Sequence, residues 1–222
     1  DTLIILQTTV PPGTTKLKVY PLLKNIVNQR RLNLNKFFLA HSYERVMPGE
    51  NYLDSIINYW RVYSGIDRIS SSKCRKFFQK IINFKKFPMT EVKNTTESEL
   101  AKVLENSYRA NNIAFINEWS QFSQEIGVDL FRVIDAIKIR PSHSNIRFPG
   151  LGVGGYCLTK DPLFAKISAK KIFKLKNHEF PFSTRSIEVN NQMPISIFFK
   201  IKKLLNHEID NKKFLVMGVS YR

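Results

Sequence analysis

The sequence contains little cysteine, which limits the classes of protein it can belong to. Two cysteines, Cys74 and Cys157, occur in 222 residues, and they lie far apart in different contexts. Small secreted domains that depend on disulfides have a much denser set. The sequence therefore argues against a disulfide framework and favours free thiols.

A long apolar run and a basic leader are also missing. A membrane-spanning helix needs about 20 consecutive apolar residues, and no run approaches that length. Residues 1–6 (Asp-Thr-Leu-Ile-Ile-Leu) carry none of the positive charge that opens a signal peptide. We therefore expect a cytoplasmic protein without a membrane partner.

Acidic residues are scarce as well. The chain has 18 Asp and Glu against 35 Lys and Arg, which gives a formal net charge of +17. Such an excess could neutralise nucleic-acid phosphates, but that use needs clustered charges. The lysines are instead spread along the chain, where amphipathic helices would expose them. The pattern favours a solvated lysine-rich surface that attracts anionic substrates, with nucleic-acid binding as the alternative.

Strand and helix patterns alternate in the first part of the chain. With 43% hydrophobic residues, the chain can bury a substantial core. The segments between the predicted strands have helical periodicity, with Thr14 or Thr15 and residues 70–72 as expected helix caps. This alternation is typical of a parallel, doubly wound α/β sheet, which binds ligands at the carboxyl ends of its strands. The predicted strands cover residues 3–9, 37–40, 62–66 and 88–92.

The pattern changes to mainly helical at residues 96–99. Thr-Glu-Ser-Glu has the spacing of a capping box, and helical periodicity continues to about Ile126, before Gly127 ends it. A parallel strand predicted near the end needs neighbours, so we expect the sequence to be an internal piece of a longer chain. The later predicted elements are helices at 130–137, after residue 162 and at 195–205, and a strand at 213–220.

The residues with the clearest chemical potential lie at 150–162, Gly-Leu-Gly-Val-Gly-Gly-Tyr-Cys-Leu-Thr-Lys-Asp-Pro. Glycines let a backbone approach a ligand, and the cysteine that follows them would be held beside it. Lys160 and Asp161 come within one helical turn of Cys157, and a positive neighbour favours the thiolate. The alternative is a small buried cysteine beside a flexible loop. We interpret Cys157 as a nucleophile and Cys74, which has no such setting, as structural.

A second set of polar residues lies on the predicted long helix. Lys102, Asn106 and Arg109 are three or four residues apart, so they share one face. Such a stripe is often solvated, but the residues around it are largely apolar, which indicates a helix buried on several sides. Polar side chains in that setting need partners, and three of them together can bind one ligand.

The segment around Cys157 resembles the nucleophile segment of the UDP-glucose/GDP-mannose dehydrogenase superfamily, in which Gly-Gly-x-Cys precedes a carboxylate by four residues. The resemblance covers essentially the whole chain. Three further segments resemble family motifs in the same order: 8–14 (Thr-Thr-Val-Pro-Pro-Gly-Thr), 44–49 (Glu-Arg-Val-Met-Pro-Gly), and 99–102 (Glu-Leu-Ala-Lys) with Asn106 and Arg109.

This resemblance implies a reaction and its catalytic residues. The family oxidises the primary alcohol of a nucleotide sugar twice, consumes two NAD and passes through a thiol-bound intermediate. A thiolate can attack the aldehyde, an ammonium and an amide can stabilise negative oxygen, and carboxylates can orient or deprotonate water. The implied residues are Cys157 as the nucleophile, Lys102 and Asn106 at the oxyanion, and Asp161, Glu44 and Thr9 at the water.

Binding residues are implied in the same way. Thr9 and Lys160 would contact the NAD cofactor, and arginines suit a diphosphate or a sugar carboxylate through bidentate hydrogen bonds. A surface salt bridge is an equal alternative for several of these arginines. No metal site is expected, because His41 and His143 have no second ligand at metal spacing. The implied substrate residues are Arg45, Val46, Arg109, Arg140, Arg147, Phe148, Gly150 and Gly154.

Some positions depart from the family pattern. Tyr43 replaces a usual proline, and Pro48 replaces a glutamate common in UDP-glucose dehydrogenases, which fits the branch that oxidises UDP-N-acetyl-mannosamine or UDP-N-acetyl-glucosamine. The sequence Cys-Leu-Thr-Lys-Asp at 157–161 is closer to UDP-glucose dehydrogenases, so UDP-glucose is an alternative substrate. No predicted strand–turn–helix carries the Gly-x-Gly-x-x-Gly spacing that binds a dinucleotide pyrophosphate, so we expect these residues alone to be inactive.

The sequence thus predicts three parts. Residues 1–95 would be the later part of an NAD-binding Rossmann domain, 96–208 a helical dimerisation and catalytic domain, and 209–222 the first strand of a UDP-binding domain. The long helix would pack against its twin in a homodimer. The alternatives from other classes are a non-catalytic helical assembly module and a basic nucleic-acid-binding protein.

Overall fold

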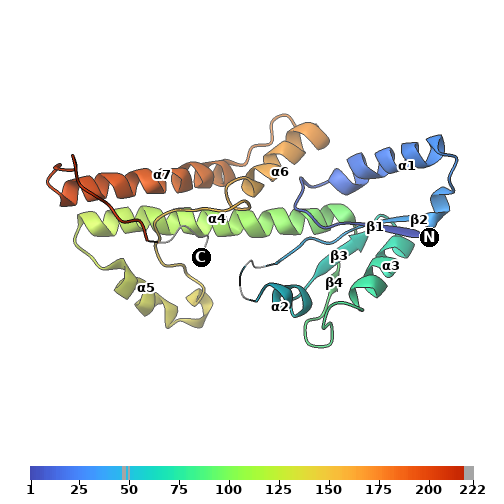
Figure 1. The fold of residues 1–222 in the computed structure, drawn as a ribbon, viewed down its shortest axis with the longest axis horizontal. Helices are drawn as coiled ribbons and strands as arrows, with labels where there is room; N and C mark the ends of the chain where they lie inside the picture. The colour runs from blue at the N-terminus through green and yellow to red at the C-terminus, as the bar shows by residue number, and fades with distance from the viewer. Residues whose placement is uncertain (47–48, 50, 218–222) are drawn as a thin grey trace. The chain divides into compact units, whose positions relative to one another are not determined.

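A computed structural model describes residues 1–46, 49 and 51–217, in two compact units. The sheet unit comprises Asp1–Glu105 with Phe164–Glu179, and the helical unit comprises Asn106–Leu163 with Phe180–Arg222. Figure 1 shows the course of the chain. The elements are β1 (Thr2–Leu6), η1 (Thr15–Val19), α1 (Tyr20–Gln29), η2 (Leu34–Lys36), β2 (Phe37–His41), α2 (Tyr52–Ile57), β3 (Val62–Gly65), α3 (Arg68–Phe78), β4 (Thr90–Glu91), α4 (Thr95–Glu125), α5 (Leu130–Lys138), η3 (Pro141–His143), η4 (Asp161–Leu163), α6 (Phe164–Ile167), η5 (Ser168–Ile172) and α7 (Pro181–Leu204).

The sheet unit contains a four-stranded sheet in the order β1-β2-β3-β4. β1 and β2 are parallel, with Leu6 opposite His41, and β3 and β4 are parallel as well. β2 and β3 are antiparallel, with His41 opposite Ser64, so the prediction of an all-parallel sheet is wrong at this pair. A parallel return needs a connection that runs the length of the strands. The six residues of α2 span about 9 Å, which is shorter than the roughly 17 Å of β2.

The core of the sheet unit is formed by β2, β3 and α3. Figure 1 shows α1 and α3 on opposite sides of the sheet, as expected for a doubly wound arrangement. The α/β class and the positions of the first four predicted strands are therefore confirmed. The core cluster consists of Ala40, Tyr63, Cys74, Phe78 and Ile82, with Ile5 and Met89 packed against it.

Residues other than the predicted ones cap α3 and α4. The Asp67 side chain accepts a hydrogen bond from Ser70 N at 2.7 Å, so α3 begins before the serines that were expected to cap it. At α4, Asn94 Oδ1 accepts from Glu97 N at 3.0 Å, and Glu97 Oε2 accepts from Lys93 N at 2.8 Å. This capping box lies two residues earlier than predicted. It leaves Glu99 available for other partners.

Thr14 and Thr15 do not cap the helix that follows them. That helix begins with the π turn η1 and has no side-chain cap. Thr14 Oγ1 donates to Pro11 O at 2.5 Å, and Thr15 Oγ1 donates to Glu99 Oε1 at 2.6 Å. The prediction of a threonine cap is wrong because a carboxylate 84 residues away takes the Thr15 hydroxyl.

α4 is 31 residues long and ends before Gly127, which has a φ of +69°. The expected burial on several sides holds for much of the helix but not for one face. Large apolar side chains at spacings of three, four and seven residues share an exposed face. An exposed stripe of this kind marks an interaction surface. We call this set the apolar stripe: Leu100, Leu104, Tyr108, Phe115, Trp119 and Phe122.

In the helical unit, α7 runs alongside α4 (Figure 1). Asn190 Nδ2 donates to Ala110 O at 3.1 Å, which joins the two helices. α7 begins at Pro181, well before the predicted start at residue 195. The helix continues through Pro194, and Pro181 occupies the first turn, where proline is favourable.

The end of the chain has no regular structure in its described part. Residues 213–217 form no strand, and the side chains of 214–217 are exposed. The predicted strand is therefore wrong at 213–217, where no neighbouring strand supplies the backbone hydrogen bonds that a strand needs. Residues 218–220 of that prediction lie outside the described residues. Of the helices that the structure describes, none combines the length and apolar character needed to cross a membrane.

We predict that Gly65→Ala strongly destabilises the sheet unit. An added Cβ would lie 2.1 Å from Ser71 N and 2.6 Å from Asp67 O, so backbone atoms at the start of α3 would have to move. The expected loss is about 3 kcal/mol or more. Gly150→Ala is the control, because its Cβ meets nothing within 4 Å. Urea denaturation followed by circular dichroism measures both, and equal stabilities would contradict the packing at Gly65.

Candidate active site

Two predicted site residues follow the carboxyl ends of β1 and β2 in the sheet unit. Beyond the strand ends, Ser42 N donates to Leu6 O at 3.1 Å, and Glu44 N donates to Gln7 O at 3.1 Å. Thr9 and Glu44 therefore follow the same edge of the sheet, and neither side chain is fully buried. This edge is where open α/β sheets bind ligands.

Glu44 is held by an arginine that the sequence did not single out. Arg61 Nη2 donates to both carboxylate oxygens of Glu44 at 3.1 Å, and Arg45 N donates to Oε1 at 2.8 Å. Arg61 is 5% exposed, and its guanidinium lies 4.6 Å from the centre of the Phe78 ring. Arg61 directly precedes β3. The antiparallel pairing brings the start of β3 to the end of β2, whereas the expected parallel sheet placed it at the opposite edge.

Arg45, a predicted substrate contact, belongs to a hydrogen-bond network inside the sheet unit. Its Nη2 donates to Glu105 Oε2 at 2.9 Å and to Tyr43 Oη at 2.8 Å, and its Nη1 donates to Trp60 O at 3.2 Å. Burial raises the pKa of Tyr43 to about 12, so this phenol stays neutral. The geometry fits the salt-bridge alternative for Arg45.

Lys102 of α4 is nearly buried in the sheet unit. It is 8% exposed, and its Nζ lies 5.5 Å from the centre of the Tyr43 ring. A cation near an aromatic face is stabilised by the ring while its N–H groups still donate to other acceptors. The position of Lys102 is thus compatible with a cation that binds a negative oxygen.

The helical unit contains a buried amide–carboxylate pair. Asn106 Nδ2 donates to Asp161 Oδ2 at 2.7 Å, and both residues are 0% exposed. Lys160 Nζ donates to Asp161 Oδ1 at 2.5 Å. Burying a carboxylate is costly unless its oxygens are hydrogen-bonded, and here each oxygen has a donor. Because an amide nitrogen carries two hydrogens, Asn106 can donate the second to a further oxygen.

Cys157 begins the turn that ends at Asp161. Its carbonyl oxygen accepts from Asp161 N at 2.9 Å and from Lys160 N at 3.3 Å. Leu158, the next residue, is 7% exposed and holds the turn against the unit, whereas Cys157 itself is exposed. Gly155 has a φ of +80°, which only glycine adopts without strain. The structure therefore joins Cys157, Asp161 and Asn106 by successive hydrogen bonds.

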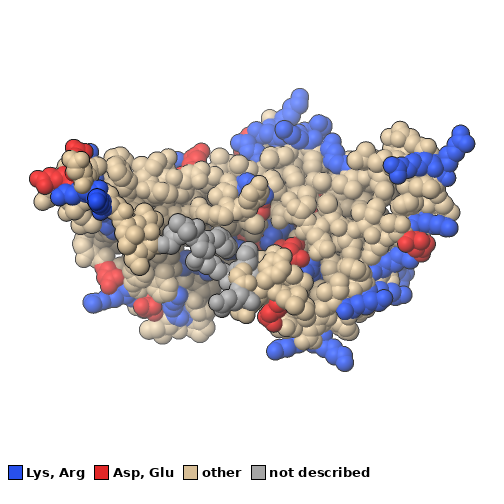
Figure 2. All heavy atoms as spheres, viewed as in Figure 1, with Lys and Arg blue, Asp and Glu red and all other residues tan. Residues whose placement is uncertain are grey.

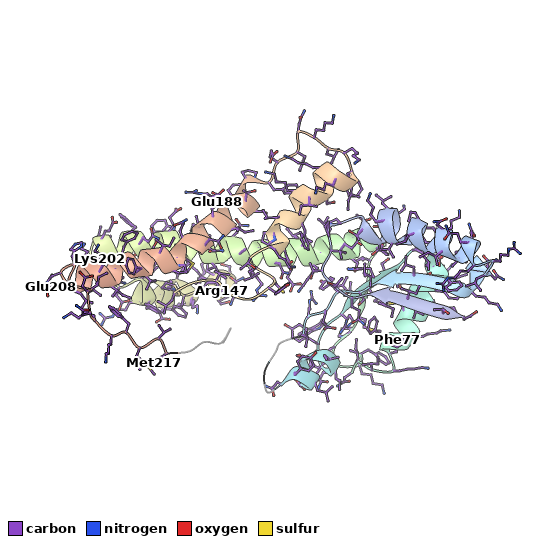
Figure 3. All side chains as sticks on the ribbon, turned by 45° about the horizontal axis from the view of Figure 1, so that its top comes forward. Phe77, Arg147, Glu188, Lys202, Glu208 and Met217 are labelled. Atoms are coloured by element: carbon purple, nitrogen blue, oxygen red, sulfur yellow. The ribbon has the colours of Figure 1, made fainter. Side chains whose placement is uncertain are left out.

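Among the residues that the structure describes, those predicted to bind substrate are not linked by hydrogen bonds in the way that Cys157, Asp161 and Asn106 are. Phe148 stacks on Phe131 of α5 with ring centres 5.6 Å apart, and Lys138 Nζ lies 3.8 Å from the centre of the Phe148 ring. Arg140 and Arg147 are exposed, and Figure 3 labels Arg147. Their roles remain predictions. Of the others, Arg109 and Val46 are partly buried, and Gly150 and Gly154 are exposed.

The second cysteine and a buried histidine are structural. His41 Nδ1 lies 2.8 Å from Ser98 Oγ, and burial lowers the pKa of His41 to about 4, so the ring is neutral. Burial raises the pKa of Cys74 to about 12. Within the described residues, no group of three His, Cys, Asp or Glu side chains could hold a metal ion.

The sequence of this chain matches a known family of proteins. Residues 96–192, which include Lys102, Asn106, Cys157 and Asp161, match the central domain of the UDP-glucose/GDP-mannose dehydrogenase family. A UDP-N-acetyl-D-mannosamine dehydrogenase from Methanocaldococcus jannaschii is 33% identical over 220 residues, which are 99% of this chain and 46% of that protein. The chain contains a central domain of the UDP-glucose/GDP-mannose dehydrogenase family. It spans about half the length of the curated family members that it matches.

Solved structures of the same family share the fold. The UDP-N-acetyl-mannosamine dehydrogenase from Staphylococcus aureus has a TM-score of 0.79 at 25% identity, over 99% of this chain and 48% of that chain. A UDP-glucose dehydrogenase from Pyrobaculum islandicum has a TM-score of 0.72 at 25% identity, over 92% and 44%. The family resemblance and the α/β fold inferred from the sequence are confirmed.

We predict that iodoacetamide alkylates Cys157 and leaves Cys74 unmodified in the native protein. The thiolate is the reacting species, and the Cys74 thiol is both buried and protonated, with a pKa of about 12. Mass spectrometry of tryptic peptides measures both sites, and a sample denatured in urea, in which both cysteines react, serves as the control. Equal labelling of the two residues in the native protein would contradict the assignment of Cys74 as structural.

Proposed function

We propose that the whole protein is an NAD-dependent nucleotide-sugar 6-dehydrogenase. It oxidises the C6 alcohol of a UDP-N-acetylhexosamine to a carboxylate, which is a four-electron oxidation. The observation that carries the proposal is the buried hydrogen bond between Asn106 and Asp161, which joins α4 to the turn that begins with Cys157. The family and the name of the Methanocaldococcus relative support this choice of reaction.

Cys157 is the proposed nucleophile. Once the C6 alcohol has been oxidised to an aldehyde, the Cys157 thiolate attacks the C6 carbon and gives a thiohemiacetal. Loss of a hydride from that carbon gives a thioester, and attack by water releases the uronic acid and restores the thiol. NAD, when bound, accepts the hydride of each oxidation.

The polar residues have separate roles in this scheme. The Lys102 ammonium and the second N–H of Asn106 stabilise the negative oxygen that forms when the thiolate or water adds to C6. Asp161 and Glu44 orient or deprotonate the attacking water, and Thr9 holds that water. The Arg61 guanidinium bonds both oxygens of Glu44 and so fixes the orientation of that carboxylate.

Some residues of the chain are suitable for contact with NAD. Thr9 follows the carboxyl end of β1, where sheets of this kind bind ligands. The Lys160 side chain is 41% exposed, so its ammonium is accessible to a phosphate while it donates to Asp161. The spacing Gly-x-Gly-x-x-Gly occurs at 150–155, but no strand directly precedes these residues and no helix directly follows them, so they do not form the strand–turn–helix that binds a pyrophosphate. We infer that the 222 residues alone reduce no NAD.

UDP-N-acetyl-mannosamine or UDP-N-acetyl-glucosamine is the proposed substrate. Pro48, which lies outside the described residues, occupies a position that UDP-glucose dehydrogenases commonly fill with glutamate. UDP-glucose is the second candidate, favoured by the sequence Cys-Leu-Thr-Lys-Asp at 157–161. The proposed substrate-binding residues are Arg45, Val46, Arg109, Arg140, Arg147, Phe148, Gly150 and Gly154.

We further propose that the protein is a homodimer formed through the apolar stripe of α4. Burying this stripe against its own copy removes large apolar side chains from water, and a two-fold interface uses the same surface on both partners. A non-catalytic assembly module would also use the stripe, but it has no need of a buried amide–carboxylate pair next to an exposed cysteine.

On the face drawn in Figure 2, Lys and Arg side chains are dispersed over several areas, which favours a solvated surface over a nucleic-acid footprint.

The test is turnover by the whole protein. With UDP-N-acetyl-mannosamine or UDP-N-acetyl-glucosamine, we expect about two NADH per uronic acid, and a kcat/KM for one of them at least about tenfold above that for UDP-glucose. Cys157→Ala lowers turnover by about 10³-fold or more, because the covalent intermediate cannot form. Cys74→Ala is the matched control and retains activity. Unchanged turnover in Cys157→Ala would overturn the proposed mechanism, and tight binding of DNA without any sugar oxidation would favour the nucleic-acid alternative.

A further inference from the structure

A buried carboxylate joins α4 to the loop that follows β1. Glu99 is 1% exposed and accepts hydrogen bonds from Gly13 N at 2.6 Å, Thr15 N at 2.7 Å and Thr15 Oγ1 at 2.6 Å. Burial raises the pKa of Glu99, and the hydrogen bonds from Thr15 and Gly13 oppose that rise. A carboxylate is costly to bury without such donors. Both oxygens of Glu99 are thus used to hold a backbone segment that lies more than 80 residues away.

The same loop is fixed at further points within the sheet unit. At its start, Gln7 O accepts from Glu44 N at 3.1 Å. Near its end, Ser168 Oγ donates to Pro12 O at 2.6 Å. Gly13 has a φ of +92°, and a Cβ there would lie 3.0 Å from side-chain atoms of Ile172 and Phe173, so α4 and the η5 segment enclose the loop closely.

Thr9 lies between these fixed points, with no regular structure of its own. Two prolines, Pro11 and Pro12, restrict the backbone between Thr9 and Gly13. The loop therefore has few ways to move except by releasing one of its ends. Lys102 follows Glu99 by three residues on α4, so the contact that holds the loop also sets the distance from the loop to Lys102.

We propose that Glu99 is a positioning residue, which holds the loop of Thr9 at a fixed place relative to Lys102. Glu99 is enclosed by its donors and touches neither substrate nor cofactor. The inference rests on the proposed function, since Thr9 is there assigned to the attacking water. If Glu99 acts in this way, substituting it lowers the rate only while Thr9 is present. If Glu99 only stabilises the fold, the effect of substituting it is the same with and without Thr9.

Glu99→Gln in the whole protein tests the proposal. The glutamine keeps the size of the side chain, but its amide nitrogen would face one of the loop's N–H donors, so one hydrogen bond is lost. We expect kcat to fall about tenfold or more, with the KM for the UDP-sugar changed less than about threefold. The reason is that a misplaced Thr9 stabilises the transition state less well. Glu97→Gln is the matched control. Glu97 accepts hydrogen bonds two residues earlier on α4 but contacts no part of the Thr9 loop, so activity stays unchanged.

A double-mutant cycle separates positioning from folding. In a Thr9→Ala background, Glu99→Gln should lower kcat further by less than about twofold, because the group that it positions is already gone. Fully multiplicative effects of the two substitutions would overturn the proposal. If Glu99→Gln does not fold, Thr15→Val replaces it, since this substitution removes only the hydroxyl donor and should show the same dependence on Thr9 with a smaller loss.

Hydrogen–deuterium exchange tests whether Glu99 holds the loop without any measurement of activity. Glu99→Gln should increase amide exchange across residues 8–15, whereas Glu97→Gln should leave exchange there unchanged, because Glu97 accepts from Lys93 and Asn94. Unchanged exchange at 8–15 in Glu99→Gln would show that Glu99 does not hold the loop, whatever the reaction. A wild-type protein that oxidises no UDP-sugar but shows the exchange pattern would refute the proposed function and leave Glu99 as the residue that holds this loop.

Discussion

The hydrogen bond between Asn106 and Asp161 is the constraint on which the candidate site depends. Both side chains are fully buried, so a carboxylate has left water and needs donors on each oxygen. Asn106 and Lys160 supply them, and the backbone of Asp161 closes the turn that begins with Cys157. Loss of either partner would leave a buried polar group unsatisfied, at a cost of about 1–3 kcal/mol or more. The position of an exposed thiol is thereby linked to the interior of the helical unit.

Carboxylates perform three different tasks along this chain. Asp161 holds the nucleophile turn, and Glu99 holds the loop after β1 through three hydrogen bonds. Glu44, in contrast, is paired with the guanidinium of Arg61 and is partly exposed. Their surroundings differ, because uncharged N–H and O–H donors replace water around Glu99, whereas Asp161 and Glu44 each accept from a cation as well. Residues of one chemical type thus have different surroundings in the two units.

Much of the fold and the central part of the site could be predicted from the sequence. The apolar runs of the first four strands, the long helical period and the glycine-rich segment before Cys157 are local signals, and each corresponds to an element or turn in the structure. The antiparallel pairing of β2 and β3 follows from the short reach of α2, which the sequence does not indicate. This pairing brings Arg61, directly before β3, to Glu44, and Arg61 was therefore missed. The partners of Glu99 lie more than 80 residues away, and no local pattern indicates them. The helix continues through Pro194, although proline removes one backbone hydrogen bond, so this residue does not set a helix boundary here.

The central claim is that the Cys157 sulfur forms a covalent bond to C6 of the sugar during turnover. Rapid acid quenching of the whole protein with NAD and UDP-N-acetyl-mannosamine, followed by digestion and mass spectrometry, measures that bond directly. The account predicts that the peptide containing Cys157 carries the mass of the nucleotide-sugar acyl group, that hydroxylamine removes this mass, and that the Cys74 peptide stays unmodified. Uronic acid formed at full rate with no adduct on Cys157, or with the adduct on another residue, would contradict it.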